Sequence, residues 1–395
     1  MNDIKSITQN TEFDKCKDMH NVILTWATGV GKSKMTIDLV NYVAREKYSR
    51  KIDAFFIVAE RAHKKNWEEE FSKWKLNKGN INVHVLCYAS LKKLRDRHCD
   101  ILVLDEGHHA FTEKRLSVLE SIDATYVYML SATLSFKRIL AIEDIFGKFY
   151  RSDVSLNDAI EKEILPDPNV FVIGLDLDND FADQEIAIGK ASNAPVVKWE
   201  DRNRYIFRNV PCIIRCTEWQ KYLHYTNSME YWKQRYQRSH NEFHRNKWVN
   251  LGSQRKRYLG ELKTEHVRKL LNKLPDDNRF ICFCSSIAQA EKLGYKTAIS
   301  SKRKDNQKVI DAFNNKEINS LFAVNMANEG MNLKDIQTGI IVQLDGTERL
   351  FIQKFGRSMR AEDPVAYIFY YRNTQDENYL KNALENIDDK FIKYL

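Results

Sequence analysis

Residues 26–33 read Trp-Ala-Thr-Gly-Val-Gly-Lys-Ser, and this glycine-rich stretch limits the possible folds more than any other part of the sequence. An apolar run at 22–24 precedes it and a helical pattern at 35–40 follows it, which predicts a strand, a tight turn and a helix start. The glycines let backbone N–H groups point into one concavity, and the helix N-terminus favours a bound anion. We therefore predict a triphosphate-binding loop. The residues expected to bind the nucleotide are Thr28, Gly29, Val30, Gly31, Lys32 and Ser33.

Two acidic residues further along the chain supply the rest of such a site. Segment 100–104 predicts a buried strand that ends at Asp105 and Glu106. Asp105 is placed to hold the shell of a Mg²⁺ ion that Ser33 also ligates, and Glu106 to orient and deprotonate an attacking water. Lys32 is expected to reach the β- and γ-phosphates. A glycine loop with a chance Gly-Lys-Ser is the alternative, and the acidic pair makes it less favoured.

Near the C-terminus, residues 353–360 read Gln-Lys-Phe-Gly-Arg-Ser-Met-Arg. Arg357 and Arg360 are three residues apart and so share one face of a helix. This geometry suits two arginines that stabilise the charge of a phosphoryl group in transfer. For each arginine alone, a solvated charge on a helix surface is the alternative interpretation.

Apolar runs and helical patterns alternate along most of the chain, which predicts an α/β protein with parallel sheets. The runs of a first lobe lie at 22–25, 54–58, 83–86, 101–104 and 126–130. A strand is expected at 169–177, followed by an acidic, mobile excursion at 178–195. The runs of a second lobe lie near 280–284, 321–324, 339–342 and 366–370. A length of 395 residues fits two or three domains.

The positive charge of the chain is concentrated in one helical segment, residues 217–274. It holds 13 Lys or Arg against 5 Asp or Glu, which equals the net charge of +8 of the whole chain. Phosphate contact is the expected role of this charge, with Arg255, Lys256 and Arg257 as candidates. The segment also carries nine aromatic residues, which either stack on bases or form the buried face of a helix.

Composition excludes some other classes of protein. No stretch approaches the ~20 apolar residues of a membrane span, and residues 1–10 lack the pattern of a signal peptide. The seven cysteines, several of them in apolar runs, are typical of reduced, buried thiols. We therefore expect no membrane association and a cytoplasmic location, in a bacterium or a phage-infected host.

The order of four motifs resembles that of superfamily 2 helicases and translocases. They are Gly-x-Gly-Lys-Ser, Asp-Glu-x-His, Ser-Ala-Thr at 131–133 and Gln-x-x-Gly-Arg-x-x-Arg, and the likeness covers residues 22–372. The Asp-Glu-Gly-His-His variant looks closest to phage recombination helicases and to the motor subunits of type I and III restriction enzymes. The resemblance implies two RecA-like parallel-sheet motor domains in tandem, at 1–152 and 153–395, with a basic helical insertion in the second.

The resemblance also implies roles for individual residues. ATP and Mg²⁺ are the implied cofactors, with Gln353 joining Lys32, Glu106 and the two arginines in catalysis. Ser131 and Thr133 would couple hydrolysis to movement, and Gly330 would contact the nucleotide. Weaker motif matches imply nucleic-acid contacts at Arg61, Ser90, Ser285 and Asn325.

Two positions depart from the pattern of this superfamily, and no convincing adenine-reading glutamine motif precedes the first strand. Trp26 stands where a small residue is usual, which suggests an unusual rear wall of the phosphate pocket. Val324 stands where many members have a phosphate-binding Thr, and Gln9 is a candidate adenine-reading residue by position only.

The leading hypothesis is a DNA-dependent ATPase that translocates or unwinds, in phage or bacterial recombination, repair or replication. An alternative is the motor subunit of a restriction or defence complex, which requires a partner chain because the sequence shows no nuclease signature. A further alternative is a clamp that binds nucleic acid under the control of ATP with little turnover. An RNA helicase is less favoured, because the glutamine motif of DEAD-box proteins is missing.

Overall fold

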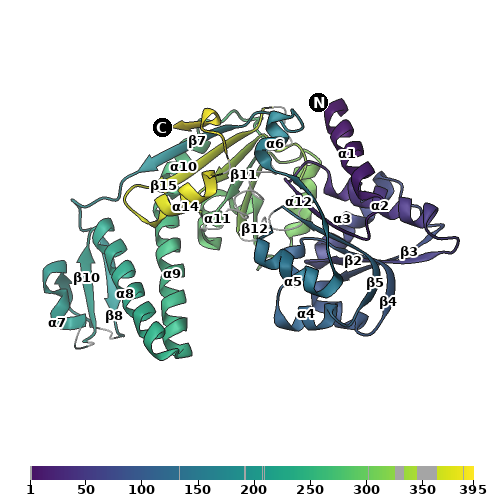
Figure 1. Ribbon diagram of the computed structural model, residues 1–395. Coiled ribbons are helices and arrows are strands. Elements are labelled where there is room, and N and C mark those ends of the chain that lie inside the picture. Colours follow the sequence, from purple (N-terminus) through teal and green to yellow (C-terminus); the bar gives the residue numbers. More distant parts are fainter. Residues whose placement is uncertain are drawn as a thin grey trace.

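The computed structural model describes residues 2–132, 134–190, 193–206, 208, 210–300, 302–324, 333–344, 363–385 and 387–395. These residues form two α/β lobes, each built on a parallel sheet, and a smaller sheet beside a helical hairpin (Figure 1). The fold class expected from the sequence is therefore confirmed. The domain boundary at residue 152 stays a prediction; β6 (Tyr150–Val154), which spans it, pairs with β1 of the first sheet.

The first lobe has six parallel strands in the order β3-β2-β4-β5-β1-β6. The strands other than β6 are β1 (Asn21–Trp26), β2 (Ile52–Val58), β3 (Ile81–Cys87), β4 (His98–Leu104) and β5 (Asp123–Ser131). The helices are α1 (Asn2–Cys16), α2 (Lys32–Glu46), α3 (Arg61–Lys73), α4 (Glu113–Leu119) and α5 (Phe136–Phe146), with 3₁₀ turns η1 (Tyr88–Leu94) and η2 (Gly107–Ala110).

Alternation along the strands explains why helices cover both faces of this sheet. Successive side chains of a strand point to opposite faces, so Val22 and Leu24 face one way and Ile23 the other. The first face packs against apolar residues of α1, α2 and α3, and the second against η1, α4 and α5. Both faces are buried, which accounts for the nearly continuous apolar runs of the sequence.

The second lobe has seven parallel strands in the order β12-β13-β11-β14-β15-β7-β16. They are β7 (Asn169–Leu175), β11 (Phe280–Phe283), β12 (Ala298–Ser300), β13 (Ser320–Val324), β14 (Thr338–Ile341), β15 (Val365–Tyr371) and β16 (Ile392–Tyr394). One face packs on α12 (Asn306–Asn314) and α14 (Gln375–Leu384), the other on α10 (Thr264–Leu271) and α11 (Ile287–Gly294). Helix α6 (Leu156–Glu161) lies between the lobes in the chain.

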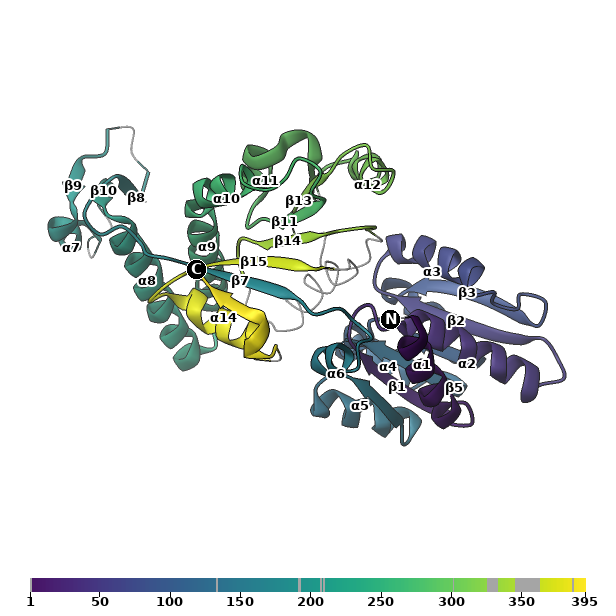
Figure 2. The same ribbon diagram turned by 90° about the horizontal axis from the view of Figure 1, so that it is seen from above.

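Segment 217–274, for which a helical insertion is expected, is largely helical in the structure. Helices α8 (Glu218–Ser239) and α9 (Glu242–Leu262) form a hairpin that turns at His240, which has a left-handed backbone (φ 49°). Thr217 and Gln220 make a capping box at the start of α8, and the Asn241 side chain caps α9. In both views the hairpin projects from the second lobe on the side away from the first lobe (Figure 2).

The expectation of a mobile excursion at 178–195 was wrong in part. Residues Gln184–Ile188 form strand β8, which pairs antiparallel with β10 (Cys212–Cys216), and β10 pairs in parallel with β9 (Val196–Lys198). Ile186 of β8 packs with Cys212, Ile214 and Cys216 of β10 in a small core of its own. The acidic residues around β8 favoured the prediction of a mobile segment. The short alternating strand within it is held by its pairing with β10.

Candidate nucleotide-binding site and nucleic-acid interface

Three neighbouring strands of the first sheet deliver the candidate catalytic residues to one edge. Strands β4, β5 and β1 are adjacent and parallel, so their carboxyl ends lie side by side. The phosphate loop follows β1, Asp105 and Glu106 follow β4, and Ser131 ends β5. Ligands of open parallel sheets bind beyond this edge. The sequence motifs, though up to a hundred residues apart, therefore meet in one place.

The phosphate loop has the backbone geometry that its glycines predict. Gly29 and Gly31 have φ values of 97° and 111°, in the left-handed region that favours glycine, and α2 starts at Lys32. A Cβ atom on Gly31 would lie 2.2 Å from Nε2 of Gln9. The loop therefore tolerates no side chain at this position, for reasons of both conformation and space.

Helix α1 closes the back of the phosphate loop, a contact that sequence reasoning did not find. The Gln9 side chain, 4% exposed, donates from Nε2 to the Val30 carbonyl at 2.7 Å. Lys5 Nζ donates to the Gly29 carbonyl at 2.6 Å. Because a trans peptide points its C=O and N–H in opposite directions, the Gly31 N–H is turned away from α1. Gln9, a candidate by position only, thus contacts the loop backbone.

The Trp26 side chain lies in the core of the first lobe, in one apolar cluster with Ala27 and Val30 of the loop. Its side chain is fully buried, and its Nε1 donates to Oγ of Ser152 on β6 at 2.9 Å. Its backbone carbonyl accepts a hydrogen bond from Lys32 Nζ at 2.6 Å. The bulky residue at this departure from the superfamily pattern therefore packs β1 against β6, and the Lys32 ammonium lies at the end of β1.

The carboxylate of Asp105 is held by two hydrogen bonds. Its Oδ2 accepts from Nε1 of Trp67 at 2.8 Å, and its Oδ1 accepts from the Glu106 backbone N–H at 3.0 Å. A hard oxygen ligand of this kind, with the Ser33 hydroxyl, fits Mg²⁺, which keeps several waters and phosphate oxygens and needs few protein ligands. No cluster of three or more His, Cys, Asp or Glu suited to a metal occurs among the residues that the structure describes.

Glu106 has an uncommon backbone conformation for a residue with a side chain. Its φ and ψ are 47° and 55°, in the left-handed region, and its Oε2 lies 3.4 Å from Nδ1 of the buried His108. A Cβ on Gly107 would lie 2.4 Å from Cγ of Met129 on β5. The turn therefore packs closely against β5. Backbone strain such as the left-handed conformation of Glu106 is frequent at functional sites.

Tyr88 is a buried neighbour of this turn that the motif comparison did not single out. Burial raises the pKa of its hydroxyl well above the ordinary value, and the charges of Asp105 and Glu106 add to the shift. Its ring lies 5.9 Å from that of His109, and the Arg115 guanidinium lies 5.3 Å from the Tyr88 ring. The phenol therefore stays neutral beside the two carboxylates.

Several predicted site residues lie outside the described part of the chain. They are Thr133, Asn325, Gly330, Gln353, Arg357 and Arg360. The contribution of the second lobe to the nucleotide site therefore stays a prediction.

Three of the described nucleic-acid candidates lie just after parallel strands, as the residues of the nucleotide site do. Arg61, exposed, begins α3 just after β2, and Ser90, half-buried in η1, follows β3. Ser285 follows β11 in the second lobe, where its backbone N–H and its hydroxyl both donate to Oε1 of Gln289, at 2.8 and 3.0 Å. All three thus lie at carboxyl edges of parallel sheets.

Arg255 does not face solvent, contrary to the interpretation that it contacts phosphates from the surface. It is 6% exposed, donates to Oγ1 of Thr226 at 3.2 Å, and lies over the Tyr222 ring at 5.8 Å. The hairpin buries it because both helices pack on this face. Lys256 is half-buried and Arg257 exposed, so these two remain candidates.

The aromatic residues of the hairpin differ in their exposure to solvent. Tyr222 and Tyr258 are buried near the second lobe, which confirms the packing interpretation for them. Tyr231 and Phe243, in the half of the hairpin near its turn, are 52% and 57% exposed. Base stacking therefore remains open for these exposed residues and for the half-buried Trp232, Tyr236 and Trp248 in the same half of the hairpin.

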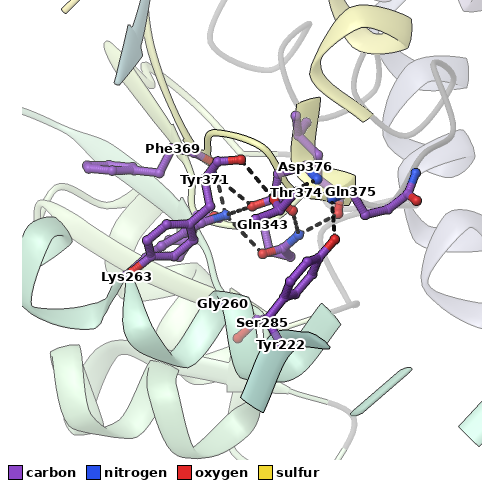
Figure 3. A network of polar contacts seen from close by, with 12 residues as sticks. Tyr222, Gly260, Lys263, Ser285, Gln343, Phe369, Tyr371, Thr374, Gln375 and Asp376 are labelled. Atoms are coloured by element: carbon purple, nitrogen blue, oxygen red, sulfur yellow. Dashed lines mark hydrogen bonds and ion pairs between the residues drawn. The ribbon is translucent and has the colours of Figure 1, made fainter. Parts of the chain in front are cut away.

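A buried polar network joins the root of the hairpin to the second lobe (Figure 3). Lys263, fully buried where α9 meets α10, donates from Nζ to Oδ2 of Asp376 at 2.6 Å and to Oε1 of Gln343 at 3.0 Å. Its other acceptors are the carbonyls of Val342 and Phe369, at 3.0 and 3.1 Å. Burial lowers the pKa of Lys263, and the charge of Asp376 opposes that shift.

Two further contacts tie this root to the lobe. The Tyr222 hydroxyl of α8 accepts from the Gln375 backbone N–H at 2.9 Å. Gln289 donates to the Gly260 carbonyl at 2.6 Å while it accepts from Ser285. A Cβ on Gly260 would lie 2.2 Å from that of Ser285. The base of the hairpin and the candidate nucleic-acid contact at Ser285 are therefore packed as one unit.

Comparisons with known proteins agree with this architecture. The family described as "Type III restriction enzyme, res subunit" matches residues 2–136, and the helicase conserved C-terminal domain matches residues 257–362. No curated protein sequence matches significantly. Within the described residues, no helix is long and apolar enough to span a membrane.

Three solved structures with a similar fold are distant in sequence. The helicase domain of Pyrococcus furiosus Hef is 15% identical, with 95% of this chain and 97% of that chain covered and a TM-score of 0.53. S. cerevisiae Dbp5, bound to RNA and ADP BeF3, is 12% identical, with 95% and 85% covered and a TM-score of 0.57. The DEAD-box helicase Mss116, bound to ssRNA and UDP-BeF, is 13% identical, with 99% and 74% covered and a TM-score of 0.57. At these identities the likeness shows the fold alone.

Two tandem parallel-sheet lobes, with a glycine phosphate loop and an acidic pair at one sheet edge, define a motor protein of the helicase type. The chain belongs to superfamily 2 of the helicases and translocases, since a family model matches each lobe and the motifs occur in the superfamily's order.

Proposed function

We propose that this chain is a Mg²⁺-dependent ATPase, stimulated by nucleic acid, that moves along or remodels DNA. The observation that carries the proposal is the meeting of the phosphate loop and the Asp105–Glu106 turn at one edge of a parallel sheet. A setting in phage or bacterial recombination, repair or replication is part of the proposal, and it rests on the resemblance of the Asp-Glu-Gly-His-His motif.

The residues of the first lobe have distinct roles in this mechanism. The N–H groups of the loop (Thr28 to Gly31) and the Lys32 ammonium bind the phosphates of ATP. Ser33 and Asp105 would hold Mg²⁺, which when bound neutralises charge on the phosphate oxygens. Glu106 orients the attacking water and takes its proton.

The second lobe completes the site in the proposed cycle. Arg357 and Arg360 stabilise the charge of the transferring phosphoryl group, supported by Gln353 and by Gly330 beside the nucleotide. Because these residues belong to the other lobe, hydrolysis requires closure of the two lobes. Ser131 and Thr133 couple that closure to movement along the polymer.

Nucleic acid is proposed to lie along the carboxyl edges of both sheets. Arg61 and Ser90 contact its backbone from the first lobe, and Ser285 and Asn325 from the second. Lys256 and Arg257 of the hairpin neutralise further phosphates. DNA is proposed as the polymer on the motif resemblance, and RNA is the alternative that the following assay separates.

The test is steady-state ATP hydrolysis without polymer and with single-stranded DNA, duplex DNA, a forked junction or RNA. Glu106→Gln serves as the blank, because it keeps the loop and Asp105 but removes the proposed base. Strong stimulation by one form of DNA supports the proposal and identifies the polymer. Stimulation by RNA alone overturns the choice of DNA, and equal weak rates throughout favour the ATP-controlled clamp.

The contribution of the hairpin is tested by the salt dependence of binding. Lys256→Gln combined with Arg257→Gln should weaken binding and lower the slope of log affinity against log salt by ~1 for each lost phosphate contact. Lys15→Gln with Lys17→Gln is a matched control, because these lysines, one exposed and one half-buried, lie near the end of α1, before β1 starts at the opposite sheet edge. Equal slopes for both double variants would remove the hairpin from the interface.

A second candidate function is the motor subunit of a restriction or defence complex. The match of residues 2–136 to the res subunit of type III restriction enzymes favours it. Gel filtration and copurification from the source cell distinguish the two: a stoichiometric partner with nuclease activity supports the subunit, and a lone chain that shows full DNA-stimulated turnover contradicts it.

A further inference from the structure

Trp67 joins helix α3 to the carboxylate that is proposed to hold Mg²⁺. It is the middle residue of α3, 4% exposed, and its Nε1 donates to Oδ2 of Asp105 at 2.8 Å. Its ring packs 4.8 Å from that of Phe56 on β2 and 5.5 Å from that of Phe71 on α3. The two phenyl rings fix the plane of the indole, and an indole N–H is a donor only. The hydrogen bond therefore has a set direction.

The second carboxylate oxygen of Asp105 accepts a hydrogen bond from the residue that follows it in the chain. Oδ1 accepts the backbone N–H of Glu106 at 3.0 Å. With one donor on each oxygen, the carboxylate cannot rotate without the loss of a hydrogen bond. Each oxygen keeps further acceptor capacity for a metal-bound water or for the metal itself. Partners of this kind orient metal ligands and typically change metal affinity when removed.

We propose that Trp67 is a positioning residue for the Mg²⁺ site, one that acts through Asp105 and touches neither nucleotide nor metal. This inference rests on the proposed function, since it assigns Asp105 to Mg²⁺. The indole N–H sets the orientation of the Asp105 carboxylate toward the phosphate loop. Its loss leaves the carboxylate free to rotate, so Mg²⁺ binds less tightly in the presence of nucleotide.

The test removes the N–H group and keeps the ring. Trp67→Phe deletes the donor, and replacement of Trp67 by 3-benzothienylalanine keeps the bicyclic shape with sulfur in place of N–H. The readout is fluorescence anisotropy of ADP that carries an N-methylanthraniloyl group, with full-length protein and a Mg²⁺ titration. Both variants should raise the Mg²⁺ concentration for half-maximal binding by roughly 10-fold or more. Binding in excess EDTA should stay at the wild-type level.

The same helix offers a matched control. Trp74, directly after α3, also donates its Nε1 to a carboxylate, Oε2 of Glu70 at 2.7 Å, but that carboxylate follows no strand of the site. Trp74→Phe should leave the Mg²⁺ titration unchanged. If Trp67→Phe changes the titration and the benzothienyl variant does not, the ring volume is responsible and the proposal is overturned. Unchanged titrations for both also overturn it.

The failure of this inference is separable from the failure of the proposed function. If wild-type protein does not bind the ADP derivative at any Mg²⁺ concentration, the nucleotide site itself is wrong. If wild-type protein binds it with Mg²⁺ and the two Trp67 variants bind equally well, only the role of Trp67 is wrong. Thermal unfolding of each variant, without nucleotide, identifies any that is not folded, and the benzothienyl variant then decides the outcome.

Discussion

Replacement of Lys263 by Met should destabilise the second lobe far more than an equivalent change at the surface. The Lys263 ammonium and the Asp376 carboxylate are 0% and 1% exposed and 2.6 Å apart. Met has similar length and no charge, so Asp376 would keep its charge in the interior with only Gln343 Nε2 and the Tyr371 N–H as donors. Removal of one partner of a buried ion pair costs about 3–5 kcal/mol.

That free energy converts into a measurable shift of the unfolding temperature. For a domain of this size each kcal/mol lowers the midpoint by about 2–4 °C, so the expected shift is roughly 6–20 °C. The assay is thermal unfolding followed by circular dichroism and by calorimetry. Lys263→Met with Asp376→Asn should recover much of the loss, because it removes both charges and leaves hydrogen-bonding groups in place.

A matched control uses the same substitution at an exposed ion pair of the same lobe. Lys316 Nζ lies 3.1 Å from Oδ2 of Asp335, and both side chains are more than half exposed. Lys316→Met should therefore cost no more than ~1 kcal/mol. If Lys263→Met and Lys316→Met shift the midpoint equally, the buried pair does not hold the hairpin root to the lobe as the contacts indicate.

Three further predictions concern the first lobe. Gly107→Ala should reduce the ATPase rate and the unfolding temperature, because its Cβ would lie 2.4 Å from Met129 Cγ, and a normal rate in a turnover assay would contradict this. Gln9→Ala should weaken nucleotide binding measured by calorimetry, because the Val30 carbonyl loses its donor; unchanged affinity would refute the role of α1. Burial would raise the pKa of Asp100, but the Arg50 guanidinium and the Asp53 N–H outweigh it and lower the pKa overall. Its contribution to stability is therefore present above its ordinary pKa of 3.8 and lost as pH falls through the lower folded value. In chemical denaturation, Asp100→Asn should cost less stability at pH 3 than at pH 6, and an equal cost would contradict this.

Features that the sequence determined by itself are those encoded in one continuous segment. The strand, turn and helix around the phosphate loop, the strand that ends at Asp105, and the helical character of 217–274 all follow from local periodicity and glycine placement. The positions of β4, β5 and β1 at one edge followed because parallel strands with helical connections leave few arrangements open. The order of the motifs along the chain is therefore enough to predict that they meet in one site.

The tertiary structure decided every feature that depends on contacts between distant segments. The Trp67–Asp105 bond joins residues 38 apart, and the Lys263–Asp376 pair residues 113 apart. Strand β8 exists only through its pairing with β10, and the charge of Arg255 turns inward only because α8 covers it. The sequence gives the type of each residue and predicts its local structure. It does not show which distant residue packs within hydrogen-bonding distance of a given side chain. Burial and orientation, and therefore the role of each charged group, are properties of the folded chain alone.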